Sequence, residues 1–162
     1  MEWTIEALQG TATFAGVSTQ TLEVLLDRGD YVVVNPGEAF FNENDFGDSF
    51  YLLEEGEVEI FKTLQDHKRI LGRLGVGDCF GEMALLAVTC RSASVVAVEP
   101  CVALKLSNRT LHKLYDQAPQ EFALIVMNLG REVCRRLRDL NDRLLTKHVQ
   151  ALGVDLPIDD AT

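Results

Sequence analysis

One stretch of the sequence decides the fold: Phe80-Gly81-Glu82-Met83-Ala84-Leu85-Leu86, followed by Cys90-Arg91-Ser92-Ala93-Ser94-Val95. Residues 81–87 favour one or two helical turns, because they contain no β-branched residue. Gly81 allows a backbone to approach a ligand closely. A helix that starts there points unpaired N–H groups and the positive end of its dipole outward. The stretch therefore predicts an anion site.

Charged side chains beside this helix extend the predicted site. Arg91 follows Glu82 by nine residues and supplies a permanently charged guanidinium that can pair with a phosphate. Glu82 would repel a phosphate, so we expect its carboxylate to accept a hydrogen bond from a hydroxyl such as a ribose 2′-OH. Ser92 adds a small donor and acceptor beside Arg91. A ligand with one phosphate, one hydroxyl and a flat apolar base fits this set.

The residues around this stretch alternate short apolar or β-branched runs with turn sequences. Short strands at a spacing of roughly 8–12 residues are typical of an all-β sandwich or barrel. We predict strands at 31–34, 50–53, 58–62, 69–74, 94–98 and 101–106. Gly37, Gly47 and Gly56 are expected to be turn residues without a role toward a ligand, and residues 54–57, all acidic except Gly56, a solvated hairpin tip.

Helices are predicted on both sides of the strands. Residues 18–28 carry leucines at helical spacing behind Ser18, a favoured N-cap residue. A second helix is expected at about 108–116, capped by Ser107 or Asn108, and a long third one at about 120–148. The second helix should direct inward Leu111, Leu114 and Tyr115. The third has a coiled-coil-like apolar seam of Phe122, Val126, Leu129, Val133, Leu137, Leu140 and Leu144.

The composition of the chain limits the number of domains and the kinds of partner that we expect. The chain has 162 residues, 47% of them hydrophobic and 25% charged, which is typical of one globular domain. The formal net charge of −10 argues against nucleic acid as a partner, because phosphate backbones require basic patches. Residues 1–60 contain 13 acidic residues and one basic residue, so an anionic ligand is expected to meet residues 61–162.

Cysteines and targeting signals indicate a cytoplasmic protein. No C-x-x-C pair occurs, and we expect free buried thiols, with no metal site, at Cys79, Cys90, Cys101 and Cys134. The N-terminus lacks the basic and apolar regions of a signal peptide, and no apolar run is long enough to span a membrane. No G-x-S-x-G, H-E-x-x-H or Walker motif is present, so we do not expect an enzyme.

The cassette at residues 80–95 resembles the phosphate-binding cassette of the cyclic nucleotide-binding domain family, whose pattern is about F-G-E-(L/M)-A-L followed by R-(S/T/A)-A. Further family-like segments are Phe14-Ala15-Gly16-Val17-Ser18, Asn35-Pro36-Gly37-Glu38, residues 47–58 and residues 77–82. The resemblance covers about residues 10–145 and is of the catabolite-activator and protein kinase A regulatory-subunit type.

The resemblance implies a mainly β fold with flanking helices: a double-stranded β-helix, or jelly-roll barrel, with a short N-terminal and a long C-terminal helix. The expected domain spans residues 1–149, with the barrel at about 30–106 and the C-terminal helices at 107–148. Residues 150–162 are expected to form a disordered tail. About fourteen residues follow the long helix, too few for a helix-turn-helix, so no attached output domain is expected.

The resemblance also implies a ligand and its contacts. The ligand is a cyclic nucleotide, cAMP more than cGMP, and no other cofactor is implied. Glu82 would bind the ribose 2′-OH and Arg91 the cyclic phosphate, with backbone N–H groups and the Ser92 hydroxyl beside it. The implied binding set is Gly81, Glu82, Met83, Ala84, Arg91, Ser92 and Ala93. The long C-terminal helix would close over the base, with candidate contacts at Leu137, Leu140 and Asn141.

Simpler readings stay open at several positions. Arg91 and Glu82 could form a structural ion pair. Leu137 and Leu140 could belong to a packing or dimer seam, and Asn141 could be a solvated surface residue. The polar face of the long helix is expected to hold Arg131, Arg135, Arg136, Arg138 and Arg143.

The sequence thus predicts a sensing module that moves its C-terminal helix on nucleotide binding to regulate an unidentified effector protein. A homodimer through the 120–145 helix is expected, and neither nucleic acid nor a membrane is an expected partner. The alternative is a nucleotide-independent dimerisation or scaffold module with a vestigial pocket.

Overall fold

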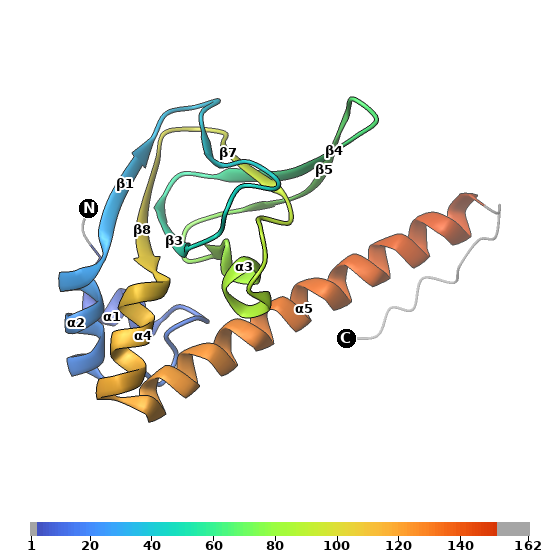
Figure 1. Ribbon diagram of the computed structural model, residues 1–162. Coiled ribbons are helices and arrows are strands. Elements are labelled where there is room, and N and C mark those ends of the chain that lie inside the picture. The colour runs from blue at the N-terminus through green and yellow to red at the C-terminus, as the bar shows by residue number, and fades with distance from the viewer. Residues whose placement is uncertain (1–2, 152–162) are drawn as a thin grey trace.

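The computed structural model describes residues 3–151, whose strands form two four-stranded antiparallel sheets (Figure 1). The first sheet, in spatial order, contains β1 (Asp30–Val34), β8 (Cys101–Ser107), β3 (Ser49–Glu55) and β6 (Cys79–Phe80). The second contains β2 (Ala39–Phe41), β7 (Ser94–Ala97), β4 (Val58–Leu64) and β5 (His67–Leu74). All six predicted strands are confirmed. The sequence analysis missed β2 and β6, which have only three and two residues.

Strand β3 separates two hydrophobic clusters. Its side chains alternate between the two faces of the sheet. Phe50 and Leu52 pack into the cluster that contains the helices, whereas Tyr51 and Leu53 pack into the cluster made by the strands. Because both faces are covered, burial continues to Glu54, which is 8% exposed. The prediction of a solvated tip at residues 54–57 was therefore wrong for Glu54.

Helices cover one end of the sheets (Figure 1). These are α1 (Ile5–Gln9), which was not predicted, α2 (Thr19–Arg28) and α4 (Asn108–Gln117). The hydroxyls of Ser18 and Ser107 accept backbone N–H bonds and cap α2 and α4, as predicted. Leu111 and Leu114 are buried, but the inward prediction for Tyr115 was wrong. Tyr115 is 52% exposed, since its ring lies outside the core at the α4–α5 junction, where it packs edge-on against Phe122 with centroids 5.4 Å apart.

Two further helices position the site. The short α3 (Glu82–Ala87) follows β6, and the 33-residue α5 (Pro119–Ala151) runs along the body and projects beyond it (Figure 1). Residues 150 and 151 continue α5, and the remainder of the predicted tail, 152–162, lies outside the described residues. Within residues 3–151, no helix is both long and apolar enough to cross a membrane.

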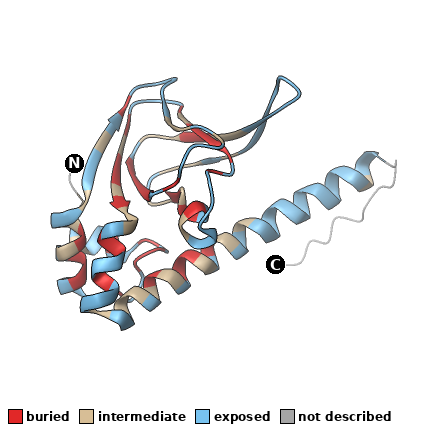
Figure 2. Ribbon diagram, viewed as in Figure 1, coloured by how far each residue is buried: buried red, intermediate tan, exposed pale blue. Residues whose placement is uncertain are grey.

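The apolar residues of α5 do not form one continuous seam. Its buried residues, among them Ile125 and Leu129, all lie in the first half of the helix, and the projecting half is largely exposed (Figure 2). Phe122, Val126 and Val133 are partly buried against the rest of the chain. The exposed members of the predicted seam are Leu137, Leu140 and Leu144. The single-seam prediction was wrong, because packing against the rest of the chain, mainly α4 and α3, buries or partly buries the first four positions.

The cysteines are free, but only two are buried. Cys79 and Cys101 lie in the core, and burial raises the pKa of the Cys79 thiol to about 12. Cys90 and Cys134 are exposed, so the expectation of buried thiols was wrong for these two. In the described part of the chain, no group of three or more His, Cys, Asp or Glu side chains is placed to hold a metal ion.

Candidate functional site

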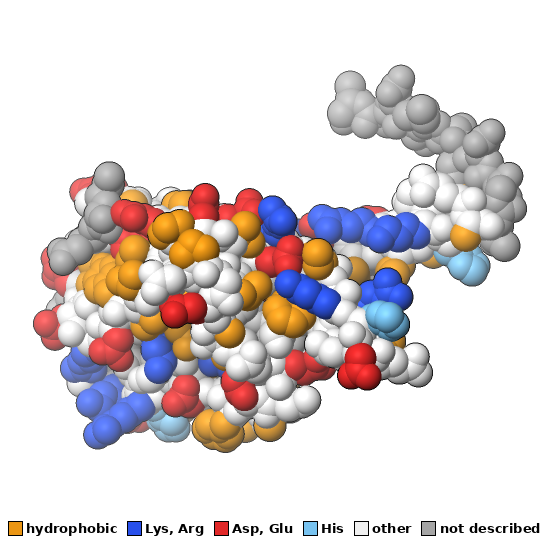
Figure 3. Space-filling view, turned by 90° about the horizontal axis from the view of Figure 1, so that it is seen from above, with side chains coloured by type: hydrophobic (Ala, Val, Ile, Leu, Met, Phe, Trp, Pro, Cys, Tyr) orange, Lys and Arg blue, Asp and Glu red, His pale blue; other side chains and the backbone are white. Residues whose placement is uncertain are grey.

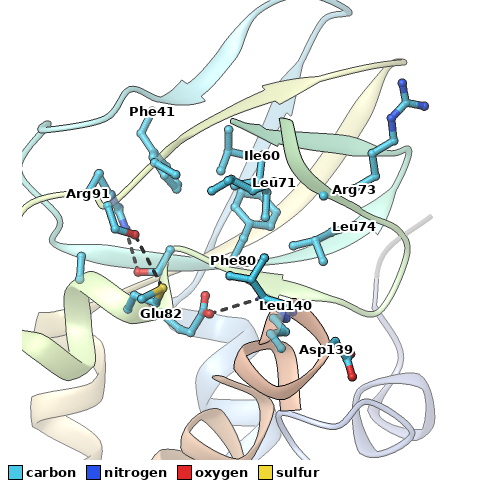
Figure 4. A pocket seen from close by; sticks show the side chains of 18 of the residues that line it. Phe41, Ile60, Leu71, Arg73, Leu74, Phe80, Glu82, Arg91, Asp139 and Leu140 are labelled. Atoms are coloured by element: carbon cyan, nitrogen blue, oxygen red, sulfur yellow. Dashed lines mark hydrogen bonds and ion pairs between the residues drawn. The ribbon is translucent and has the colours of Figure 1, made fainter. Parts of the chain in front are cut away.

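A cavity of about 240 Å³ lies between α3, the second sheet and α5 (Figure 4). Arg91 and Phe41 lie at one end, Ile60, Leu71 and Leu74 lie toward the other, and Leu140 approaches from α5 (Figure 4). The cavity lining includes every residue of the predicted binding set, namely Gly81, Glu82, Met83, Ala84, Arg91, Ser92 and Ala93. The cavity thus combines a cationic end with an apolar end.

Arg91 is a buried cation held from three sides. It is 4% exposed, and its Nη1 and Nη2 donate to the Gly81 carbonyl at 2.8 Å and the Ser49 hydroxyl at 3.3 Å. The guanidinium lies 4.1 Å from the centroid of the Phe41 ring. Burial lowers the pKa of Arg91, because it disfavours the charged form. Among the described residues, Arg91 forms no ion pair, and its Nε is buried without a hydrogen-bond partner. Such a cation is suited to bind an anion.

Two glycines allow the backbone to close around Arg91. Gly81 has φ +83°, and a Cβ there would lie 2.6 Å from Nη1 of Arg91. Gly47 lies against α3, where an added Cβ would overlap the Cβ of Ala84. Gly47 is not among the residues that line the cavity, and its packing against α3 is a role that the sequence analysis did not predict. Close packing, which any side chain would prevent, explains the glycine at this position.

The loop before β3 holds the backbone of Arg91. The Arg91 N–H donates to the Asp45 carbonyl at 2.8 Å, and the Asn44 N–H donates to the Arg91 carbonyl at 2.9 Å. These two bonds hold the Arg91 backbone against the loop. The loop thus sets the position from which the Arg91 guanidinium extends into the cavity.

Glu82 forms its ion pair with α5 and not with Arg91. Its carboxylate, on a residue 3% exposed, lies 3.3 Å from Nη1 of Arg136. Burial raises the pKa of Glu82, although the positive charge of Arg136 opposes this effect. The alternative of an Arg91–Glu82 ion pair is therefore wrong, and so is the placement of Arg136 on the polar face. Arg136 also contacts Glu132 at 2.7 Å, and its Nη2 is buried without a hydrogen-bond partner.

Sequence reasoning missed Arg136 as a site residue. Five arginines occur on the same helix, and their spacing alone did not distinguish one of them. A signal was nevertheless present, since Glu132 precedes Arg136 by one helical turn and can pair with it. The same face, one turn further on, carries Leu140.

The structure separates the three candidate base contacts. Leu140 lines the cavity, whereas Leu137 and Asn141 are not among its lining residues. The reason is helical geometry, because 3.6 residues per turn place Leu140 and Arg143 on the same side as Arg136. Asp139 also reaches the cavity and adds a carboxylate near its rim.

Residues 31–118, more than half of the chain, match the family described as "Cyclic nucleotide-binding domain". The chain belongs to this family. The resemblance carried by the cassette is therefore confirmed, as is the mainly β jelly-roll fold with its long C-terminal helix.

This cyclic nucleotide-binding domain is similar to two curated proteins and to a solved domain. The "Cyclic AMP receptor protein" of Thermus thermophilus is 34% identical over 82% of this chain and 60% of that protein. The "cAMP-dependent protein kinase regulatory subunit" of Eremothecium gossypii is 29% identical over 70% of this chain and 25% of that protein. A solved cyclic nucleotide-binding domain from Methylobacillus flagellatus has a TM-score of 0.79 at 26% identity, covering 88% of this chain and 81% of that one. The chain thus spans three fifths or less of these two curated relatives.

Ser92 closes one side of the domain's cavity. Its hydroxyl lies 3.7 Å from the sulfur of Met83, which is 48% exposed. This weak contact leaves the Ser92 hydroxyl able to rotate toward a ligand. Ala93, 8% exposed, lies behind it as part of the cavity wall.

Proposed function

We propose that this domain binds a 3′,5′-cyclic nucleotide, cAMP in preference to cGMP, and uses it to reposition α5 and so regulate an effector protein. The observation that carries the proposal is Arg91, a buried guanidinium without an ion pair among the described residues, facing a cavity. The names of the two curated relatives support cAMP as the ligand. The proposal assigns the chain a binding and regulatory role in the cytoplasm, not a catalytic one.

The proposed contacts divide the ligand among three groups of residues. Arg91 and the Ser92 hydroxyl bind the cyclic phosphate, together with backbone groups of Gly81, Met83 and Ala84. Glu82 accepts a hydrogen bond from the ribose 2′-OH. The base occupies the apolar end, against Ile60, Leu71 and Leu140.

We propose that Arg136 couples nucleotide binding in the cavity to the position of α5. A hydroxyl that binds Glu82 shares this carboxylate with Arg136, because both contact the same group. Ligand binding therefore changes the contact that ties α5 to α3. A ligand can shift a helix only if it favours one arrangement over the other, and this shared carboxylate provides such a difference. The regulated form is proposed to be a homodimer through residues 120–145.

The deciding experiment is isothermal titration of ligand-free protein with cAMP and then cGMP. We expect one site per chain with a Kd of about 1 μM, which corresponds to about −8 kcal/mol. Stronger binding of cGMP would overturn the purine assignment only. No heat with either nucleotide, from a sample shown to be folded and free of bound nucleotide, would favour the scaffold alternative instead.

Replacing Arg136 by glutamine should weaken both the fold and nucleotide binding. The change leaves the buried Glu82 without its ion-pair partner, whereas Glu132 keeps Arg135 at 2.7 Å. Breaking a buried ion pair destabilises a protein by about 3 kcal/mol. We expect a lower melting temperature and about tenfold weaker cAMP binding. Calorimetry and titration measure these two effects. The control is Arg138→Gln, the same charge change at an exposed position of α5, which should change neither.

Nucleotide affinity should fall as the pH falls through the raised pKa of Glu82. Above this pKa the carboxylate is charged and accepts the ribose hydrogen bond, whereas below it the protonated group is a weaker acceptor. The cyclic phosphodiester stays ionised throughout. Titrations between about pH 8 and pH 5 test this expectation. Glu82→Gln should bind weakly and without this pH dependence, and a parallel pH profile in both proteins would contradict the assigned role of Glu82.

A further inference from the structure

A second cavity, of about 210 Å³, lies between α3, the loop before β3 and the start of α4. Its lining includes Phe46, Leu85, Val88 and Asn108. Phe46 and Val88 are 83% and 89% exposed, so this cavity has an apolar rim that the rest of the described chain does not cover. Ala84 lines both this cavity and the nucleotide cavity. The helix α3 is therefore the wall between the two.

The conformation of Val88 has no explanation within the chain. Its φ is +52°, in the left-handed region where a β-branched residue is strained. Glycine is the usual residue just after a helix in this conformation, because it has no Cβ. The Val88 side chain is almost fully exposed, so packing within the described residues does not offset the strain. A valine at this position is explained by a contact outside the chain.

An unpaired acceptor belongs to the same cavity. Oδ1 of Asn108 is buried, and none of the described residues donates a hydrogen bond to it. A buried acceptor without a donor is costly, so an incoming N–H group would be favoured there. The occupant must also be apolar where it meets Phe46 and Leu85. Among side chains, tryptophan alone combines a large apolar ring with a polar group that only donates.

We infer that the second cavity is a docking site for a tryptophan side chain of the effector protein. The indole ring lies against Phe46 and Val88, and its N–H donates to Oδ1 of Asn108. Tryptophan is also among the residues that contribute most to binding at protein–protein interfaces. The inference rests on the proposed function for the existence of an effector, and it names the surface and the chemistry through which that effector binds.

The charges beside the second cavity favour basic residues next to this tryptophan. Two exposed carboxylates, Asp45 and Asp48, lie in the loop before β3. They accept hydrogen bonds from the Asn42 N–H and the Ser49 hydroxyl, and neither forms an ion pair within residues 3–151. The buried Arg91 interacts electrostatically with both and offsets only part of their charge. Figure 3 shows Lys and Arg side chains gathered along the projecting half of α5, so a basic segment is not expected to bind there.

Nucleotide binding is expected to strengthen docking at the second cavity. A cyclic phosphate bound to Arg91 would neutralise this cation and leave the charges of Asp45 and Asp48 unopposed. A basic segment would then be attracted more strongly. Ala84 adds a second connection, because it belongs to both cavity walls. By linkage, the docked segment must strengthen cAMP binding by the same factor.

The test measures protection of Cys90, which is exposed and lines the second cavity. In a Cys134→Ser protein, Cys90 is the only exposed cysteine of the described residues. The probe is the peptide acetyl-Lys-Lys-Trp-Lys-Lys-amide, and the readout is the rate at which iodoacetamide alkylates Cys90. A Kd of about 1 mM gives about sixfold slower alkylation at about 5 mM peptide, because only the unoccupied site reacts. A control peptide with phenylalanine in place of tryptophan keeps the charge but lacks the N–H donor, and it should protect less.

Three variants of the Cys134→Ser protein separate docking from folding. Val88→Gly removes the strain together with the side chain. It should melt at or above the parent temperature and bind cAMP, yet lose protection by the tryptophan peptide. Asn108→Leu should make the two peptides protect equally, because the acceptor is gone. Val76→Ser is the matched control, since it changes a valine that is 63% exposed outside the second cavity, and it should behave like the parent.

Each outcome decides between the inference and the function on which it rests. Equal protection by the two peptides in the parent protein, or full protection in Val88→Gly, would overturn the inference and leave the proposed function intact where cAMP still binds. Protection by the tryptophan peptide in a protein that binds no cyclic nucleotide would contradict the proposed function alone. Protection that cAMP leaves unchanged would contradict the coupling through Ala84 and Arg91.

Discussion

Arg91→Leu is expected to weaken cAMP binding by more than about 100-fold. The variant removes the charge and the donors that we propose bind the cyclic phosphate, and hydrogen bonds to a charged group contribute about 1.5–3 kcal/mol each. Two such bonds suffice for this loss. Isothermal titration against the wild type measures it.

Folding of Arg91→Leu should be largely retained. The variant leaves the Gly81 carbonyl and the Ser49 hydroxyl without their donor, but it also removes a buried cation that has no ion pair among residues 3–151. These effects oppose each other, because an unpaired buried charge is itself costly. The melting temperature, measured by circular dichroism, checks this point.

A second variant tests the role of Arg91 even if Arg91→Leu does not fold. Arg91→Lys keeps the positive charge but loses the planar fork of donors, so we expect intermediate affinity. Wild-type affinity in Arg91→Leu would contradict the assignment of the cassette. Equal loss in both variants would mean that the geometry of the guanidinium, more than its charge, binds the phosphate.

Gly47→Ala is expected to reduce both stability and nucleotide affinity. The added Cβ would overlap that of Ala84, and it would lie 3.4 Å from the Arg91 side chain. Overpacking of this kind costs about 1–3 kcal/mol, which lowers the melting temperature of a chain of this size by about 2–4 °C per kcal/mol. Because Ala84 of α3 lines the cavity and must shift, we also expect about tenfold weaker cAMP binding.

Gly75→Ala is the matched control. A Cβ at Gly75 would meet nothing within 4 Å, and its backbone does not require a positive φ. This variant should melt and bind like the wild type. A Gly47→Ala protein that behaves like Gly75→Ala would contradict the close packing of α3 on the loop.

Most of the fold could be predicted from the sequence, because strands and helix starts are indicated by residues that are close together in the chain. Strands of four or more residues between turn residues, and serines before α2 and α4, could be read directly. The short β2 and β6 could not, because two or three residues show no periodicity. Glu54 and Tyr115 depended on which tertiary surfaces cover a position, and a sequence pattern does not contain this information.

In the candidate site, too, residues close in sequence could be predicted, whereas residues brought together by the fold could not. The residues of the predicted binding set lie within thirteen positions of sequence, 81–93, and all of them line the cavity. Arg136 joins Glu82 across 54 positions of sequence, so its role required the path of α5. The same path placed Leu140 in the cavity wall but left Leu137 and Asn141 outside it. Contacts between distant segments, and not the chemistry of single residues, were what the sequence analysis lacked.

Because α5 extends far beyond Arg136, a small rotation of the helix at the cavity displaces its far end by a larger distance. Fifteen residues separate Arg136 from Ala151, the last residue of α5, and they span about 22 Å at a rise of about 1.5 Å per residue. A rotation of about 10° at Arg136 therefore displaces the far end by about 4 Å. In the proposed function, this displacement at the end of α5 is the change that the effector protein recognises.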